Sequence, residues 1–126
     1  MNLQKYFDQA KGIGVLATAD SSGKVDAAIY ARPHVLEDGT IAMVMADRLS
    51  HHNLQSNPQA AYLFVEKGEG YEGKRLFLKK IAEEKNTERL KAMLRKCSCD
   101  AVKEADGHDR YLVIFKLEKE LPLVGA

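Results

Sequence analysis

What the sequence lacks limits its possible functions before any motif is considered. Its apolar runs stay well short of a membrane-spanning helix, and the first residues lack the long apolar core of a signal peptide. The 19 basic and 18 acidic residues leave a net charge of +1, so no broad basic surface is available for nucleic acid or acidic membranes. We therefore expect a cytoplasmic protein with neither partner, in which any anion-binding site is local.

Cysteine is also scarce. Cys97 and Cys99 are too few and too close for a disulfide framework, so we expect reduced thiols. Their spacing differs from the paired cysteines of structural zinc sites, and we expect no metal even though Asp100, His108 or His34 could add ligands. No serine, histidine and acidic residue stand out together as a nucleophile, so no catalytic residue is assigned.

The 126 residues, 45% hydrophobic and 29% charged, are typical of one globular domain spanning residues 1–126. Apolar and alternating segments predict strands, and helical spacing predicts helices. Strands are expected at 13–19, 25–31, 41–46, 60–66, 74–82 and 111–117, helices at 2–11, within 46–58 and after Thr87, and a polar loop at 103–110. Six strands joined by short turns favour a mainly β fold, an antiparallel β-barrel with a few helices.

Two of the predicted strands are apolar on both faces. Residues 41–46 are apolar at every position, and residues 61–65 are nearly so. A strand with one face in water should alternate instead. A helix, a bound ring system or another subunit must therefore cover the second faces, and we expect a homodimer because two-fold dimers are the commonest closed assembly.

A polar turn, residues 46–58, separates these two strands. Arg48 and Ser50 place a cation and a hydroxyl near a helix N-terminus, where free N–H groups and the helix dipole favour an anion. Arginine can hold phosphate through two hydrogen bonds, and serine can donate to the anion or cap the helix. A solvated helix cap without a ligand is the alternative. His51 and His52 follow directly and receive no assigned chemistry.

A small-residue strand is the second candidate for ligand contact. Three alanines surround Tyr30 in residues 27–32, and they leave a shallow main-chain surface on which a flat ring could lie. Tyr30 and Arg32 share a face and supply a hydroxyl and a cation. Small residues demanded by close packing are the alternative explanation.

Two further segments carry features of phosphate sites. Lys74 and Arg75 begin a strand and could reach a phosphate or a substrate carboxylate, or could only discourage edge pairing. Residues 68–73 match the dinucleotide glycine fingerprint, but a strand follows them rather than a helix, so we interpret them as a hairpin.

The order of these segments resembles the pyridoxamine 5′-phosphate oxidase-like, FMN-binding split-barrel superfamily. The resemblance covers roughly residues 3–118 and is most specific at 25–66, where Asn-Leu-x-x-Asn-Pro occupies 53–58. It implies a six-stranded Greek-key split barrel with FMN at a homodimer interface. It also implies that Arg48 and Ser50 hold the phosphate and that the ring lies along residues 28–31 and 45–46. The resemblance and the residue patterns described above together predict eleven cofactor-binding residues: Ala28, Ile29, Tyr30, Ala31, Arg32, Met45, Ala46, Arg48, Ser50, Lys74 and Arg75.

The chain departs from the pyridoxamine phosphate oxidases at two places. Leu49 replaces the central arginine of their Ser-Arg-Lys phosphate motif, and the chain has no tryptophan for their C-terminal substrate segment. We therefore expect an FMN-dependent oxidoreductase for another small substrate, with the flavin supplying the chemistry. The alternatives are a non-catalytic FMN carrier that passes electrons to a protein, or a barrel that binds haem or another ligand through His34, His51 or His52.

Overall fold

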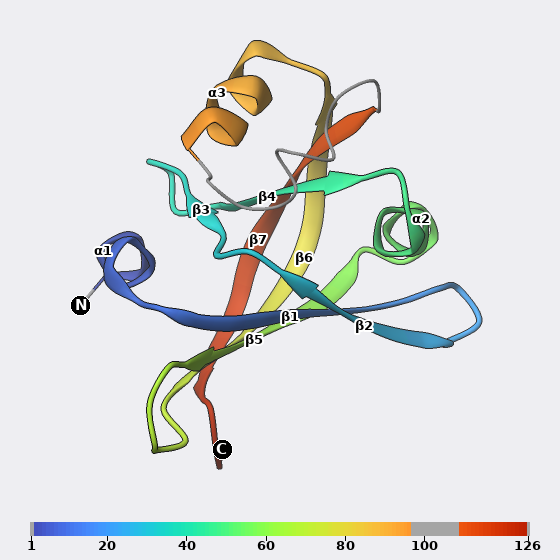
Figure 1. Cartoon of the computed structure of the whole chain (residues 1–126). Coiled ribbons are helices and arrows are strands. Elements are labelled where there is room, and N and C mark those ends of the chain that lie inside the picture. Colours follow the sequence, from blue (N-terminus) through green and yellow to red (C-terminus); the bar gives the residue numbers. More distant parts are fainter. Residues whose placement is uncertain (1, 97–108, 126) are drawn as a thin grey trace.

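The computed structural model describes residues 2–96 and 109–125 as one sheet with three short helices (Figure 1). The elements are α1 (Leu3–Gln9), β1 (Gly12–Ala19), β2 (Val25–Tyr30), β3 (His34–Val35), β4 (Ile41–Ala46), α2 (Leu49–Ser56), β5 (Gln59–Glu66), β6 (Gly73–Lys85), α3 (Glu88–Lys96) and β7 (Arg110–Pro122). The strand order is β2-β1-β5-β6-β7-β4-β3, and all neighbours are antiparallel. The predicted mainly β class is confirmed.

The structure has seven strands where the sequence predicted six. The additional strand, β3, is the pair His34–Val35, which bonds to Ala42 and Ile41 of β4. Two residues directly after Pro33 are too few to produce an alternating pattern, so the sequence carried no signal for this strand. The predicted number was wrong for that reason, although all six predicted strands are present.

β6 and β7 extend further than predicted. β6 continues to Lys85 and β7 begins at Arg110, a residue that we wrongly assigned to a loop. The polar end of β6, residues 83–85, pairs with residues 111–113 of β7, and register shifts next to Phe77 and Lys80 bend the sheet. The sheet curls, so that β2, at one end of the strand order, and β4 lie opposite each other without pairing (Figure 1). A cavity lies between them.

Apolar side chains fill the inside of the curl and the space beneath α3. On the outer face of β4 and β7, Ala42 and Leu112 pack with Leu90 of α3. β4 is apolar at every position because the interior cluster covers one face and a helix covers the other. The interior cluster consists of Phe7, Leu16, Ile41, Met43, Met45, Leu54, Tyr62, Phe64, Leu76, Leu78, Val113 and Phe115.

The described helices contain seven, eight and nine residues. α1 begins after Asn2, whose side-chain oxygen accepts a hydrogen bond from the main-chain N–H of Lys5 at 2.9 Å. None of the described helices combines the length and the apolar character that crossing a membrane requires.

Candidate functional site

A cavity of about 430 Å³ lies between β2 and β4. The start of α2, the start of β7 and Met93 of α3 complete its lining. Nine of the eleven predicted cofactor-binding residues line this cavity, and they come from β2 and the two residues after it, from the end of β4 and from the start of α2. These nine are residues 28–32, Met45, Ala46, Arg48 and Ser50.

Main-chain groups border the cavity on two sides. Within the described residues, β2 pairs only with β1, and residues 43–46 of β4 pair only with β7. Each strand therefore keeps one edge of N–H and C=O groups that no neighbouring strand uses. A flat ligand with polar edges could bond to these groups, as the alanine-rich strand suggested.

Tyr62 fixes the main chain where β2 ends. Its hydroxyl donates to the carbonyl oxygen of Ala31 at 3.0 Å, and its side chain is fully buried on β5. Burial raises the pKa of the Tyr62 phenol, although the nearby Arg32 lowers it, so the group remains a donor. Gly14 makes this possible, because a Cβ there would lie 1.9 Å from the Tyr62 hydroxyl oxygen. The sequence showed Tyr62 only as part of an apolar strand.

The first turn of α2 forms the polar end of the cavity. The N-cap is Arg48, which makes no side-chain capping bond, while Ser50 lies inside the helix and is 4% exposed. Ser50 therefore does not cap the helix, which was one of its two expected roles. An arginine side chain has no acceptor with which to cap N–H groups. The first turn of α2 therefore presents the positive end of the helix dipole and the Ser50 hydroxyl to the cavity. No side chain at the N-cap accepts hydrogen bonds from the main-chain N–H groups of this turn.

Tyr30 connects this polar end to the strand. Its hydroxyl shares a hydrogen bond with the Ser50 side chain. Burial is the main cause that raises the pKa of Tyr30; Asp26 raises it further, while Ser50 and the positive charge of Arg48 oppose the shift. The phenol is therefore protonated at neutral pH and can donate a hydrogen bond to a ligand.

Arg110 is a cavity residue that the sequence interpretation missed. It pairs with Ala46 across β4 and β7, lines the cavity and is only 5% exposed. Its guanidinium Nη1 donates to the carbonyl oxygen of Asp109 at 3.1 Å, and the described residues form no ion pair with it. A buried cation at this place favours an anion in the cavity. It follows a polar run without periodicity, so no pattern identified it.

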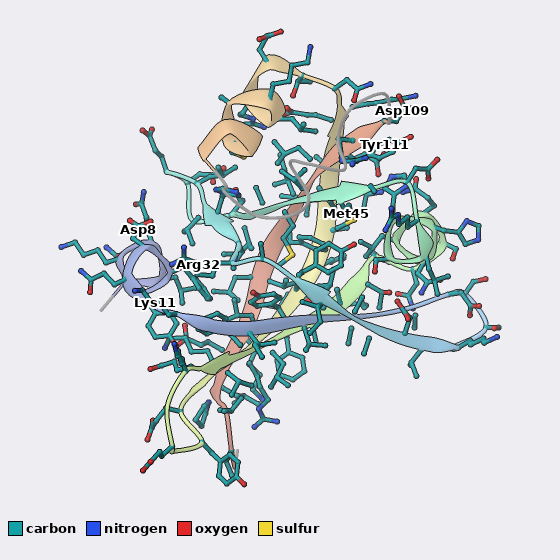
Figure 2. The ribbon with its side chains drawn as sticks, viewed as in Figure 1. Asp8, Lys11, Arg32, Met45, Asp109 and Tyr111 are labelled. Carbon is teal, nitrogen blue, oxygen red and sulfur yellow. The ribbon has the colours of Figure 1, made fainter. Side chains whose placement is uncertain are left out.

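Arg32 has a structural role besides lining the cavity. Its Nη1 donates to the carbonyl oxygens of Phe7 and Ala10, at 2.9 and 2.7 Å, and Figure 2 shows its side chain beside α1. A cation is favourable at a helix C-terminus. Arg32 therefore ties α1 to the rim of the cavity.

The structure does not bring Lys74 and Arg75 to the cavity. Lys74 Nζ lies 2.7 Å from a carboxylate oxygen of Glu120, and Arg75 donates to the carbonyl oxygens of Pro122 and Gly125. Both residues connect β6 to the C-terminal end of β7 instead.

The histidines occupy three different environments. His34 lines the cavity, His51 is buried on α2, and His52 is exposed on the same helix. The other candidate metal ligands, Cys97, Cys99, Asp100 and His108, lie outside the described residues.

Comparisons of the whole fold identify similar solved structures. An FMN-binding protein from Syntrophomonas wolfei has a TM-score of 0.77 at 17% identity, over 98% of this chain and 84% of that one. A pyridoxamine 5′-phosphate oxidase-like protein from Lactobacillus delbrueckii has a TM-score of 0.69 at 13% identity, over 96% and 92%. The haem storage protein HutZ from Vibrio cholerae has a TM-score of 0.65 at 15% identity, over 97% and 95%.

No protein-family model and no curated protein sequence matches the chain. At such low identities the structural likeness shows the fold alone. The predicted resemblance to the FMN-binding split-barrel superfamily is confirmed at that level. Solved proteins with this fold include an FMN-binding protein and a haem storage protein, so the fold does not identify the ligand of this chain. The residues that line the cavity must indicate it.

Proposed function

We propose that the chain is an FMN-binding flavoprotein that acts as an FMN-dependent oxidoreductase on a small molecule. The cavity between β2 and β4 carries this proposal, because it gathers Arg48, Ser50 and Arg110 beside Tyr30 and two strand edges. Its volume of about 430 Å³ lies within the range of small-molecule sites, roughly 300 to 1,000 Å³.

The polar end of the cavity fits a phosphate monoester. Such a group carries a charge of about −1.5 to −2 at neutral pH and accepts several hydrogen bonds. Ser50 and the first turn of α2 would donate to its oxygens, and Arg48 and Arg110 would balance its charge.

The rest of the cavity fits a flat, partly apolar ring. Met43, Met45 and Ile29 line it with apolar surface, and the Tyr30 hydroxyl, which is hydrogen-bonded to Ser50, adds a polar group. The edges of β2 and β4 add main-chain donors and acceptors for the polar atoms of the ring. These features support a flavin in preference to a ligand without hydrogen-bonding edges.

When bound, FMN supplies the electron and hydride transfer chemistry. The chain contributes binding and orientation: Arg48 and Ser50 anchor the phosphate, and the Tyr62 bond to Ala31 holds the strand end against which the ring lies. No protein nucleophile is required. Since Leu49 stands where pyridoxamine phosphate oxidases have arginine and no tryptophan is present, we do not propose pyridoxamine phosphate as the substrate.

We also propose that two copies form the working unit. Val25 and Ile29 of β2 and Ile13 of β1 are 79%, 72% and 59% exposed. Ile29 also lines the cavity, so a second copy that covers this apolar face would border the ligand. Light scattering should give twice the chain mass, and an Ile13→Glu variant should give a monomer; a monomeric wild type contradicts this assembly.

Haem is the second candidate ligand. His34 lines the cavity together with Met43, Met45 and Met93, and imidazole and thioether groups can ligate haem iron. His51 does not suit this role, because both of its ring nitrogens lie within 3.2 Å of carboxylate oxygens.

The visible absorption spectrum of the purified protein, with mass spectrometry of any released ligand, separates flavin from haem. Titration with FMN, followed by quenching of flavin fluorescence, tests a chain purified without ligand, and riboflavin tests the phosphate contribution. A colourless protein that quenches neither flavin overturns the proposal. Turnover of the bound flavin by NAD(P)H or a small organic acceptor separates an oxidoreductase from an electron carrier.

A further inference from the structure

Arg32 lies at the end of the cavity away from the proposed phosphate site. Its side chain contacts α1, which precedes β1, whereas Asn53 of α2 bonds to Thr18 near the far end of β1. Figure 1 shows α1 and α2 at these two ends of β1. The proposed ring-binding residues 28–31 line the cavity between Arg32 and α2. The cavity therefore has a positive charge at each end.

Three features hold Arg32 in place before any ligand binds. The carbonyl oxygen of Ala31, directly before it, accepts the 3.0 Å hydrogen bond from the Tyr62 hydroxyl. Pro33, directly after it, is buried and restricts the main chain of Arg32 to extended conformations. Nη1 of the guanidinium donates to two carbonyl oxygens at the C-terminal end of α1, and Figure 2 shows the side chain there. Such preorganisation lowers the entropic cost of binding a ligand.

One edge of this guanidinium has no partner among the described residues. Nη1 carries two N–H groups, and the two carbonyl oxygens of α1 accept from them at 2.9 and 2.7 Å. The three remaining N–H groups, on Nε and Nη2, have no acceptor in the described part of the chain. No carboxylate there forms an ion pair with Arg32 either. The side chain is exposed at the rim, where a small molecule can reach it.

Arg89 shows what the same edge binds elsewhere in this protein. Its Nε and Nη2 donate to the two carboxylate oxygens of Glu84, which is the side-on pairing of an arginine with a carboxylate. Arg75 uses the same two nitrogens for carbonyl oxygens near the end of β7. Both of these arginines use the edge within the protein, whereas Arg32 leaves it available to a ligand.

The cavity around Arg32 suits the apolar part of an organic acid. Met43 lines this end, because it follows the β4 residue that pairs with His34, and Met93 of α3 adds a second thioether. Asp26 is the one acidic residue among the described residues of the lining, and it lies opposite Thr18, near the end of β1 that α2 contacts. No carboxylate of the described lining therefore opposes an anion at Arg32.

We propose that Arg32 binds the carboxylate of a small organic acid, and that this acid is the substrate. The inference rests on the proposed function, because it names the substrate class of the same cavity. The two oxygens of a carboxylate match Nε and Nη2, so the acid would accept two charge-assisted hydrogen bonds. Its apolar part would then lie between Met43 and residues 28–31, beside the place proposed for the flavin ring.

The test measures binding of two acids, benzoate and hexanoate, to the full-length chain saturated with FMN at low ionic strength. Benzamide and hexanamide are the controls, because they have similar shapes and no charge. Calorimetry gives the affinities, and a change in the flavin absorption spectrum reports binding beside the ring. At least one acid should bind about tenfold more tightly than its amide, the worth of a charge-assisted hydrogen bond, and should change the spectrum.

Four variants, each saturated with FMN, isolate the residue. Arg32→Met should abolish the preference for the acid, and Arg32→Lys, which keeps the charge without the two-nitrogen edge, should weaken it several fold. Lys11→Gln removes an exposed positive charge next to α1 but outside the cavity, and it should keep the preference. Asn2→Ala removes the N-cap bond of α1, so it controls for the loosening of this helix and should also keep the preference.

The outcomes separate this inference from the proposed function. If the chain binds FMN but neither acid binds more tightly than its amide, the carboxylate site is overturned and the FMN site stands. A wild-type preference in Arg32→Met, or an equal loss in Asn2→Ala, overturns the role of Arg32 in the same way. If the chain binds no FMN, the proposed function fails and the inference fails with it.

Discussion

The cavity and the β5–β6 hairpin end of the sheet carry similar side chains in different settings. At the hairpin end, the Lys74 ammonium lies 2.7 Å from Glu120 and 4.8 Å from the centroid of the Tyr6 ring. The Tyr6 hydroxyl donates to a carboxylate oxygen of Glu66 at 2.5 Å. Lys74 and Tyr6 each have an acidic partner from the protein there, whereas Arg75 donates to main-chain carbonyl oxygens.

In the cavity, Tyr30 and Arg110 have no carboxylate partner among the described residues, although Asp26 also lines the space. Tyr30 bonds to Ser50 rather than to a carboxylate, and Arg110 donates to a main-chain carbonyl. Both the hydroxyls and the guanidinium line an open space. The comparison teaches that a basic residue near a tyrosine indicates a ligand site only where it also lines a cavity and no carboxylate of the described residues pairs with it.

The largest expected effect is on folding, at Gly14. In Gly14→Ala, the new Cβ would lie 1.9 Å from the Tyr62 hydroxyl oxygen and 2.7 Å from the Tyr30 carbonyl oxygen. Urea unfolding should show a loss of about 2 to 3 kcal/mol, and FMN affinity should fall because Tyr62 is displaced from Ala31. Gly12→Ala is the control, because its new Cβ would lie 2.0 Å from the Val65 carbonyl oxygen. This variant should lose similar stability, but its folded form should keep the FMN affinity of the wild type. Equal loss of affinity in both variants would contradict the assignment.

The charge balance is tested by Arg110→Met against Lys74→Met. Removal of Arg110 should weaken FMN about 10- to 100-fold, the worth of one charge-assisted hydrogen bond, and leave riboflavin unchanged. Lys74→Met should leave both affinities unchanged, because its ammonium pairs with Glu120. Fluorescence titration measures both. A Lys74 variant as weak as the Arg110 variant would remove the distinction between the two regions.

Tyr62, beside the cavity, and Tyr6, at the hairpin end, allow a comparison with smaller expected effects. Tyr62→Phe leaves the Ala31 carbonyl without its donor, so stability should fall by about 1 kcal/mol and FMN affinity by a few fold. Tyr6→Phe removes the bond to Glu66 and should lower stability without changing FMN affinity. Thermal unfolding and FMN titration of both variants check this, and unchanged FMN affinity in Tyr62→Phe would remove the positioning role.

The smallest expected effect is a pH dependence at Glu83. Its pKa in the folded chain is about 2, below the ordinary 4.5, so its ionised form stabilises the fold above about pH 4.5. That contribution should disappear as the pH falls through about 2. Because the carboxylate is partly solvated, we expect a loss of less than about 1 kcal/mol. Unfolding of wild type and Glu83→Gln should therefore differ at pH 6 by more than at pH 2; a constant difference would contradict this.

The predicted residues that line the cavity were chosen from local chemistry. Arg48 and Ser50 were predicted because the start of a helix can be recognised from the residues around it. Residues 28–31 were predicted because their small side chains can be read directly from the sequence. Lys74 and Arg75 looked equally suitable, and only the position of Glu120 and the C-terminal carbonyls separates them from the cavity residues. Arg110 and Tyr62 were missed because neither a polar run nor an apolar strand reveals which side chain meets a ligand cavity.

Alternation, turn residues and helix spacing were enough to specify a mainly β fold, six of its strands and the helix within residues 46–58. These properties arise from neighbours along the chain. The cavity arose only when the curled sheet brought β2 opposite β4, two strands that do not pair. The Nε2 atom of His51 likewise meets a carboxylate oxygen of Glu83, a residue 32 positions away. Long-range contacts decide which polar groups meet each other and which face a ligand, and no local pattern encodes that choice.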